Sequence, residues 1–380
     1  FERMPEFFRR ALRISYSGRP GVVHLDVPES VMNGVFDADG IDLRPPKEYR
    51  RTTPIEPTPS EVTQTADLLR NAERPHIHSG YGVLHAHGSA ALQEVVEALG
   101  CPATTSWAGR GAMPDDHHQL LPIWAMDPIN ESRSEADAVL VVGSRLGETD
   151  WWGKPPYWGQ PGEQKMVQVD IDDEILGLNK STELAVLADA NAFLSALAAE
   201  LRSTPISEER LQSNRARTSE LVEGQAKVRG QLDAALQNTA TPMHSSHVPV
   251  TCQKVFGNDA VYVFDGGNAT VWASFFTDIN NPDSLLSTFK FGMLGAGVSQ
   301  ALGGQIAKPD AKVVCIIGDG AMGFHMQELE TALRNELPVI YLVLCDKQWG
   351  MVKLTQTIGL QMLRPAIGTD QQGTINADFE

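Results

Sequence analysis

The fold of this chain is decided by one stretch in its C-terminal third, Val313-Val314-Cys315-Ile316-Ile317-Gly318-Asp319-Gly320-Ala321-Met322-Gly323. Its first five residues are apolar, which is typical of a parallel strand buried on both faces. The glycines that follow open a helix, and backbone N–H groups at such a strand-to-helix turn favour an anionic phosphate. The stretch therefore predicts an open α/β sheet that binds its ligand at the carboxyl ends of the strands.

The surrounding sequence extends this sheet in both directions. Further buried strands are expected over 261–265 and 339–345, with helices over 295–307 and 323–335. Together these elements predict an α/β unit over residues 244–380, with a mainly parallel sheet.

A second unit of the same kind is expected upstream, over residues 60–205. Its expected elements are helices over 61–71, 89–99 and 191–202 and strands over 75–79, 138–143, 165–171 and around Val186. Alternating strands and helices imply a parallel sheet covered by helices on both faces. The predicted fold class is therefore α/β, with consecutive doubly wound, mainly parallel-sheet domains, the central one being Rossmann-like.

The remaining segments are interpreted as connections and as the end of another domain. Residues 1–36 predict a helix over 4–16 and a buried strand over 22–28, which are too short to form a domain. Residues 37–59 are rich in Pro, Arg and Thr and predict a linker, and residues 206–243 predict a polar, helix-permissive connector. The start at Phe1 and the stop at Ala377-Asp378-Phe379-Glu380, inside an expected element, indicate a fragment cut at both ends.

Composition excludes several classes of function. The 380 residues carry a formal charge of -17, which disfavours nucleic acid and anionic membranes as partners. We find no apolar run approaching the ~18–20 residues of a membrane span. The four cysteines show no CxxC spacing, which fits a reducing, cytoplasmic location.

The glycine motif at Gly318 has two interpretations. It satisfies the G-x-G-x-x-G fingerprint of a Rossmann NAD-dependent oxidoreductase, and Asp346 lies near the usual place of the ribose-binding acid. However, the Asp319 carboxylate would repel a pyrophosphate unless a divalent cation lay between them. Because Asp346 leaves a neighbouring strand, the two carboxylates and a diphosphate could share one Mg²⁺.

The chain resembles thiamine-diphosphate-dependent enzymes in this region. Gly318-Asp319-Gly320, followed about 27 residues later by Cys345-Asp346-Lys347-Gln348-Trp349-Gly350-Met351, is similar to the family's motif, which starts Gly-Asp-Gly and usually ends Asn-Asn. The resemblance implies thiamine diphosphate and Mg²⁺ as cofactors, with the metal held by Asp319, Asp346 and the backbone carbonyl of Gln348. It also implies cofactor contacts at Gly318, Gly320, Ala321 and Met322. Asp346 departs from the usual Asn, and its extra charge should favour Mg²⁺ and work against the diphosphate.

Two upstream segments extend the resemblance to acetolactate synthases. The run Gly292-Met293-Leu294-Gly295 is similar to the segment that crosses beneath the cofactor, which implies that Leu294, or the adjacent Met293, is the apolar wedge that bends thiamine. Asp265-Gly266-Gly267-Asn268 matches the first diphosphate contact, which implies roles for Gly267 and Asn268. Residues 1–36 look like the end of the family's pyrimidine-binding domain. The family's activating glutamate belongs to that domain and is expected upstream, so no residue here inherits a catalytic role, and the fragment is expected to be inactive alone.

The resemblance implies a thiamine-diphosphate- and Mg²⁺-dependent decarboxylase or carboligase, which makes or breaks carbon–carbon bonds in 2-oxo acids or 2-hydroxyacyl compounds. Activity like that of 2-hydroxyacyl-CoA lyase or oxalyl-CoA decarboxylase is an alternative. Trp349 and Met351 are expected in the substrate pocket, and the family's shared sites imply a homodimer or homotetramer. A non-catalytic thiamine-diphosphate-binding protein remains a further alternative.

Other motifs point elsewhere or nowhere. After Arg145 the chain lacks the other acidic and basic residues of flavin-binding synthases, and Thr355 replaces the Trp of their acceptor pocket. FAD binding and true acetolactate synthesis are therefore disfavoured. The residues His76, His78, His85 and His87 have zinc-like spacing, but packed or hydrogen-bonded histidines are the commoner outcome. The aromatic loop 151–158 is expected to pack on its own sheet rather than form a lid, and His117-His118 is expected in a solvated loop.

Overall fold

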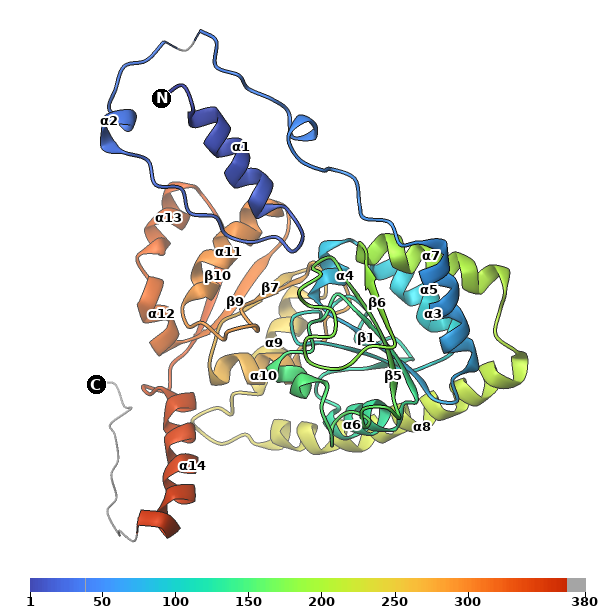
Figure 1. Ribbon diagram of the computed structural model, residues 1–380. Coiled ribbons are helices and arrows are strands. Elements are labelled where there is room, and N and C mark those ends of the chain that lie inside the picture. The colour runs from blue at the N-terminus through green and yellow to red at the C-terminus, as the bar shows by residue number, and fades with distance from the viewer. Residues whose placement is uncertain (38, 368–380) are drawn as a thin grey trace.

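The computed structural model describes residues 1–37 and 39–367, and side chains within the last helix as far as residue 359. Two wholly parallel sheets organise this part of the chain (Figure 1). The first has the strand order β3-β2-β1-β4-β5-β6. Its strands are β1 (Pro75–Ser79), β2 (Ala103–Thr105), β3 (Leu120–Leu121), β4 (Ala138–Val142), β5 (Lys165–Asp170) and β6 (Leu184–Leu187).

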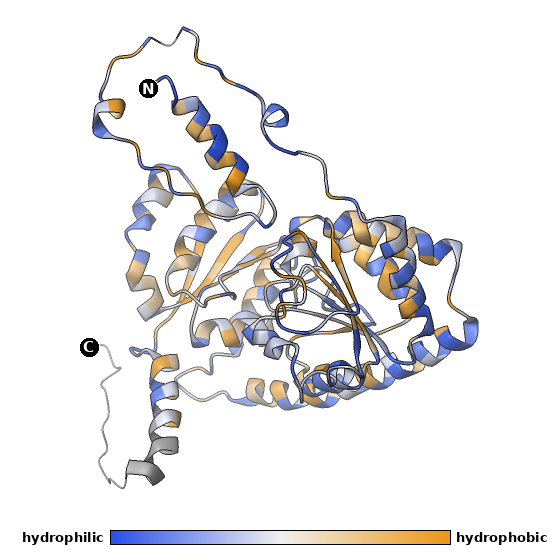
Figure 2. Cartoon of the chain, viewed as in Figure 1, coloured by the Kyte–Doolittle hydropathy of each residue, from blue (hydrophilic) through white to orange (hydrophobic). Residues whose placement is uncertain are grey.

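Helices cover this first sheet and close its core. They are α3 (Pro59–Asn71), α4 (Tyr81–His85), α5 (Ser89–Leu99), α6 (Met126–Glu135) and α7 (Ala190–Ser203), with a 3-10 segment η2 (Glu148–Gly153). Helix α3 starts with a capping box in which Thr58 Oγ1 accepts from the Glu61 N–H and a Glu61 carboxylate oxygen accepts from the Thr58 N–H. Apolar residues of α5 and α7 pack with the strands in one large cluster. Figure 2 shows the strands as mainly hydrophobic and the helices as mixed.

The second sheet has the order β10-β9-β7-β8. Its strands are β7 (Val261–Phe264), β8 (Leu285–Ser287), β9 (Val313–Gly318) and β10 (Ile340–Leu344). Its helices are α9 (His247–Phe256), α10 (Asn268–Phe276), α11 (Ala296–Ala307), α12 (Asp319–His325), α13 (Glu328–Arg334) and α14 (Gly350–Ile367). Leu344 pairs with Gly318, so the carboxyl ends of β9 and β10 lie side by side.

The two sheets are linked by α8 (Glu208–Asp233) and the short η3 (Ala234–Gln237). The N-terminal segment carries α1 (Met4–Ser15), α2 (Glu29–Met32) and η1 (Pro46–Glu48) and runs outside both sheets (Figure 1). We refer below to the part built on the six-stranded sheet as the central unit, and to the part built on the four-stranded sheet as the C-terminal unit.

The structure confirms the predicted fold class, since both sheets are parallel and alternate with helices. Strand β1 and helix α5 have the predicted bounds. The predicted strand over 22–28 is wrong: among the described residues this segment pairs with no strand, and Val22 is fully exposed. An apolar run becomes a strand only where a neighbour satisfies its backbone groups.

Two further expectations differ from the structure. The predicted helix over 323–335 is two helices that begin at Asp319 and break near Met326. Strand β10, predicted to be buried and central, is an edge strand of the described sheet, with half-buried side chains. The short strands β2, β3 and β8 were not predicted. The expectation for residues 377–380 lies outside the described residues, among which no helix is long and apolar enough to cross a membrane.

Candidate cofactor site

A cavity of about 860 Å³ lies at the carboxyl ends of β7, β9 and β10. Most of the predicted site residues line it, although they come from segments far apart in the sequence. Those residues are Gly267, Asn268, Leu294, Gly318, Asp319, Gly320, Ala321, Asp346, Gln348, Trp349 and Met351. The topology therefore brings the predicted constellation together at the strand ends, where open α/β sheets bind ligands.

The two predicted metal-binding carboxylates lie at the ends of neighbouring strands. One Asp319 carboxylate oxygen accepts a hydrogen bond from the Gly320 N–H, and the other accepts from the Lys347 N–H, both at 2.9 Å. Asp346 Oδ1 accepts from the Gln348 N–H at 3.2 Å. Lys347 adopts a left-handed backbone conformation with φ 57°, which folds this loop back toward Asp319. Backbone donors thus orient both carboxylates while leaving oxygen positions toward the cavity.

A third segment reaches the same point. A Cβ atom placed on Gly350 would lie 2.7 Å from Asn268 Nδ2 and 3.3 Å from Asp346 Oδ2. The Asn268 amide, the Asp346 carboxylate and the start of α14 therefore converge, and a side chain at position 350 would fill the space between them. This donor set consists of carboxylate, amide and carbonyl groups, which suits a hard, oxygen-preferring cation such as Mg²⁺.

Asp265 organises the cavity wall from behind, a role that we did not predict. Its buried carboxylate accepts hydrogen bonds from the Gly266 N–H at 2.6 Å, the Gly295 N–H at 2.9 Å and the Gly297 N–H at 2.6 Å. These bonds tie the end of β7 to the segment that carries Leu294. A Cβ atom on Gly266 would lie 2.6 Å from the Gly292 carbonyl oxygen, so only glycine allows this approach. The sequence signal that could have predicted this role is an acidic residue placed between a buried strand and two glycines.

Three predicted residues lie elsewhere. Gly292 lines a different cavity, Met293 is half exposed, and Met322 packs against the cluster around β9 and α11. Several residues that we did not predict line the site, including His244, Trp272 and Cys345. The rings of His244 and Trp272 meet edge to face, with centroids 4.8 Å apart.

The cysteine thiols differ in their access to solvent. Cys345 is exposed and lies 3.5 Å from Asp319 Oδ2, whereas Cys101, Cys252 and Cys315 are buried. Among the described residues there is no cluster of three or more His, Cys, Asp and Glu side chains that could hold a metal. The predicted magnesium set has only two such side chains, because its third ligand is a backbone carbonyl.

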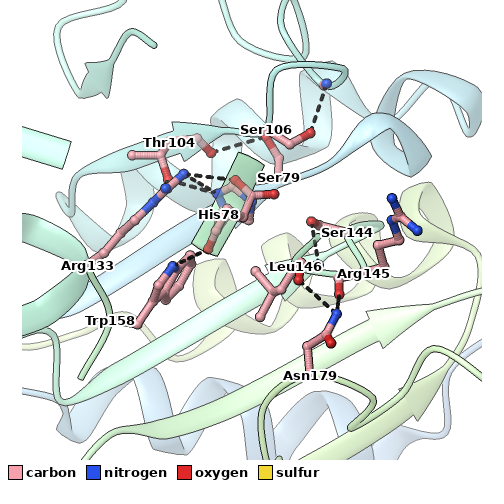
Figure 3. Close-up of polar contacts among 12 residues, drawn as sticks. His78, Ser79, Thr104, Ser106, Arg133, Ser144, Arg145, Leu146, Trp158 and Asn179 are labelled. Atoms are coloured by element: carbon pink, nitrogen blue, oxygen red, sulfur yellow. Dashed lines mark hydrogen bonds and ion pairs between the residues drawn. The ribbon is translucent and has the colours of Figure 1, made fainter. Parts of the chain in front are cut away.

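The cavity lined by Gly292 has a volume of about 720 Å³ and also lies beside β1, β4 and β5 of the central unit. Arg19, Arg145 and Lys290 line it, and the pKa of Lys290 is lowered, chiefly by the Arg19 charge. In Figure 3 the Arg145 side chain points away from the His78 cluster, while its carbonyl accepts from Asn179 Nδ2 at 2.8 Å. The same cavity is also lined by four acidic residues, Glu148, Asp150, Asp170 and Asp189, so charges of both signs surround it.

Beneath this cavity lies a buried polar network, part of which Figure 3 shows. The Nδ1 atom of His78 lies 3.0 Å from Thr104 Oγ1 and 3.1 Å from the Arg133 guanidinium, which stacks over the Trp158 ring. His76 bonds Ser132 and Thr104. The histidines at 76 and 78 are thus packed and hydrogen-bonded, as the sequence favoured. The aromatic loop is anchored by buried Trp158, while Trp151 and Trp152 stay partly exposed.

Comparisons with known proteins agree with this geometry. The model "Thiamine pyrophosphate enzyme, central domain" matches residues 62–197, and "Thiamine pyrophosphate enzyme, C-terminal TPP binding domain" matches residues 265–379. A probable acetolactate synthase large subunit from Methanococcus aeolicus is 26% identical over 94% of this chain and 60% of its own length. The acetolactate synthase isozyme 1 large subunit of Escherichia coli is 27% identical over the same shares.

A 2-hydroxyacyl-CoA lyase from Oryza sativa is also similar, at 28% identity over 90% of this chain and 59% of its own length. The chain therefore spans about 60% of the length of the curated relatives that it matches.

Proposed function

The chain belongs to the thiamine pyrophosphate enzyme family, and we propose that it holds the diphosphate of that cofactor through Mg²⁺ in the cavity formed by β7, β9 and β10. The observation that carries this proposal is the pair of carboxylates, Asp319 and Asp346, on strand ends that are neighbours in the sheet. Each carboxylate is oriented by backbone N–H donors. Without a cation, two adjacent carboxylates would repel a diphosphate.

The residues around this pair divide into two roles. Asp319, Asp346 and the Gln348 carbonyl would hold the metal, while Gly267, Asn268, Gly318 and Gly320 would let the backbone approach the diphosphate closely. Leu294 lies against Gly266 and lines the cavity, which supports its role as the apolar support beneath the thiamine rings. When bound, the cofactor would act as an electron sink for a carbanion next to a carbonyl group.

For the full-length gene product we propose carbon–carbon bond cleavage or formation in 2-oxo acids or 2-hydroxyacyl compounds. The names of the relatives support both substrate classes. Trp349 and Met351 line the cavity and would pack on the acyl part of the substrate and exclude water. We assign no residue of the present chain to the role of the activating glutamate, so we propose that this chain alone is inactive.

Two alternatives from other classes make different demands on the site. A dinucleotide-binding oxidoreductase would place its pyrophosphate beside Asp319, where the facing Asp346 adds a second negative charge, and this favours the metal-dependent cofactor. A non-catalytic thiamine-diphosphate-binding protein would use the same groups without turnover, so only an activity measurement distinguishes it.

Assembly, location and domain bounds are further parts of the proposal. We propose a homodimer or homotetramer, supported by exposed apolar side chains in α12, in α13 and between them, among them Phe324, Met326 and Leu333. The buried thiols of Cys101 and Cys315, whose pKa values burial raises to about 12, fit a reducing cytoplasm. We propose domain bounds at 60–205 and 244–380, which enclose both matched ranges.

Turnover of small 2-oxo acids tests the activity. The full-length gene product would be incubated with pyruvate, thiamine diphosphate and Mg²⁺, and both carbon dioxide release and the carbon–carbon product would be measured. A second reaction would offer a 2-hydroxyacyl-CoA and follow release of the aldehyde. We expect cofactor-dependent turnover in one of these assays. Binding of thiamine diphosphate without turnover of either class would favour the non-catalytic alternative.

A further inference from the structure

Helix α10 connects the cofactor cavity to the contact between the two units. Its first turn carries Asn268 and Ala269, and Trp272 follows one turn later, and all three line the cavity. Its nine residues span about 14 Å, and its other end meets the central unit. Any shift or tilt of this helix would therefore move Asn268 relative to Asp346 and the diphosphate.

Arg110 of the central unit donates hydrogen bonds to the carboxyl end of this helix. Its guanidinium donates to the Ser274 carbonyl at 2.6 Å and to the Thr277 carbonyl. The last carbonyl groups of a helix have no partner within the helix, and a cation placed there also complements the helix dipole. The Arg110 side chain is fully buried, so solvent does not weaken these charge-assisted bonds.

The charge of Arg110 is balanced by Asp115 from its own loop. Asp115 Oδ2 accepts from Arg110 Nε at 2.9 Å and from the Ile279 N–H at 2.8 Å, and the Asp115 N–H donates to the Ile279 carbonyl at 3.1 Å. The loop fits closely against this segment, because a Cβ on Gly111, whose φ is 92°, would lie 3.2 Å from the Asn281 carbonyl oxygen. Arg110 and Asp115 thus join the two units through hydrogen bonds to each other and to the segment that ends α10.

A second arginine supports the same end of α10 less tightly. Arg229 of α8 donates to the Phe275 carbonyl at 3.3 Å, and its guanidinium lies 5.4 Å from the centre of the Phe276 ring. This side chain is partly exposed and also pairs with Asp233. The two arginines come from outside the C-terminal unit, so α10 is held at its carboxyl end by elements that do not themselves line the cavity.

We propose that Arg110, fixed by Asp115, is a positioning residue. It sets the position of α10 along its own axis, and thereby the placement of Asn268 and Gly267 against the cofactor diphosphate. The inference rests on the proposed thiamine diphosphate function. Nothing in it requires Arg110 to touch the cofactor. It makes the central unit a determinant of cofactor affinity in the C-terminal unit.

Thiamine diphosphate titrations at saturating Mg²⁺ test the role. For Arg110→Met in the full-length gene product we expect the dissociation constant to rise roughly tenfold or more, as when groups that orient a ligand set are lost. Arg110→Lys keeps the charge but not the fork that bridges Ser274, Thr277 and Asp115, so we expect an intermediate loss. Arg229→Met should have the smallest effect of the three.

The matched control is Arg133→Met, which removes another buried arginine of the central unit that contacts His78 and Trp158 rather than α10. It should lower the melting temperature while leaving the dissociation constant within about twofold. If Arg110→Met fails to fold, Arg110→Met/Asp115→Asn removes both buried charges together and keeps an acceptor for the Ile279 N–H. We expect the same loss of affinity from this double variant.

Two readouts on the wild type need no variant. Cofactor and Mg²⁺ should protect the exposed Cys345 thiol from alkylation, and should slow amide hydrogen exchange at Thr277 and Ile279. Unchanged exchange there on cofactor binding, or unchanged affinity in both Arg110 variants beside a wild type that binds, would overturn this inference and leave the proposed function standing. A folded wild type that does not bind the cofactor would remove both.

Discussion

The two units place their polar side chains in different environments. In the central unit, His76, His78, Arg133 and Asp150 lie inside the protein and satisfy one another around Trp158. In the C-terminal unit, Asp319 and Asp346 face a cavity and accept hydrogen bonds from backbone N–H groups. The first arrangement stabilises a fold, and the second leaves charge available for a ligand. Perturbing each unit should therefore affect different properties.

The largest loss of stability is expected in the central network. Arg133→Met should lower the free energy of unfolding by roughly 3–5 kcal/mol, because it leaves the buried Asp150 carboxylate without its guanidinium partner. Urea unfolding followed by circular dichroism measures this. A loss below about 1 kcal/mol would mean that the buried Asp150 carboxylate does not depend on Arg133 as its charge partner.

The next effect concerns the wall of the cavity. Asp265→Asn keeps the size of the side chain but replaces one of two acceptor oxygens by a donor that faces backbone N–H groups. We expect about 2–3 kcal/mol of lost stability together with weaker cofactor binding. Thermal unfolding with and without thiamine diphosphate and Mg²⁺ separates the two losses. A variant that is destabilised but binds the cofactor normally would show that cofactor affinity does not depend on the hydrogen bonds of Asp265.

The buried histidines predict acid sensitivity of the central unit. Burial lowers the pKa of His76 well below its usual 6.5 and also lowers the pKa of His78, so both bind protons less readily in the folded chain than in the unfolded chain, which takes up protons below pH 6.5. Stability should therefore be fully present above pH 6.5 and fall as the pH decreases, by up to about 1.4 kcal/mol per pH unit for each histidine.

Unfolding measured between pH 7 and pH 5 tests this expectation. His76→Asn should flatten the dependence by about one proton. An equal slope in wild type and variant would show that another group causes it.

The smallest effect is expected at Asp346, where the family usually has Asn. Asp346→Asn removes one negative charge beside the diphosphate and weakens one metal ligand, so affinity for Mg²⁺ should fall and metal-saturated affinity for the diphosphate should rise, each by roughly 1 kcal/mol. Separate titrations of metal and cofactor measure the change in affinity for Mg²⁺ and the change in affinity for the diphosphate. A change of the same sign in both would mean that Asp346 does not lie between metal and diphosphate.

Sequence reasoning succeeded where local signals and burial agreed. The bounds of β1 and α5 followed from apolar runs that end at turn residues, such as Gly100, which has the left-handed conformation of a helix C-cap. It failed where a tertiary partner decides the outcome, as for 22–28, which has no neighbouring strand in the described structure, and for β10, whose edge position no local pattern reveals.

For the site, sequence reasoning found the residues that would touch the cofactor more readily than those that hold them in place. Asp319, Asp346, Asn268 and Leu294 carry a recognisable spacing, and the fold brings them to one cavity. The supporting roles of Asp265 and Arg110 depend on hydrogen bonds to backbone atoms 30 or more residues away, and side-chain type alone does not predict such bonds.

The most direct test of the central claim is a calorimetric titration of thiamine diphosphate into the full-length gene product, with Mg²⁺, with EDTA, and again with Asp319→Ala. We expect binding that requires Mg²⁺ and is lost in the variant, because the metal joins the carboxylates to the diphosphate. Binding that is indifferent to EDTA, or no binding by a folded wild type that instead binds NAD, would contradict it and make the turn at Gly318 a dinucleotide site.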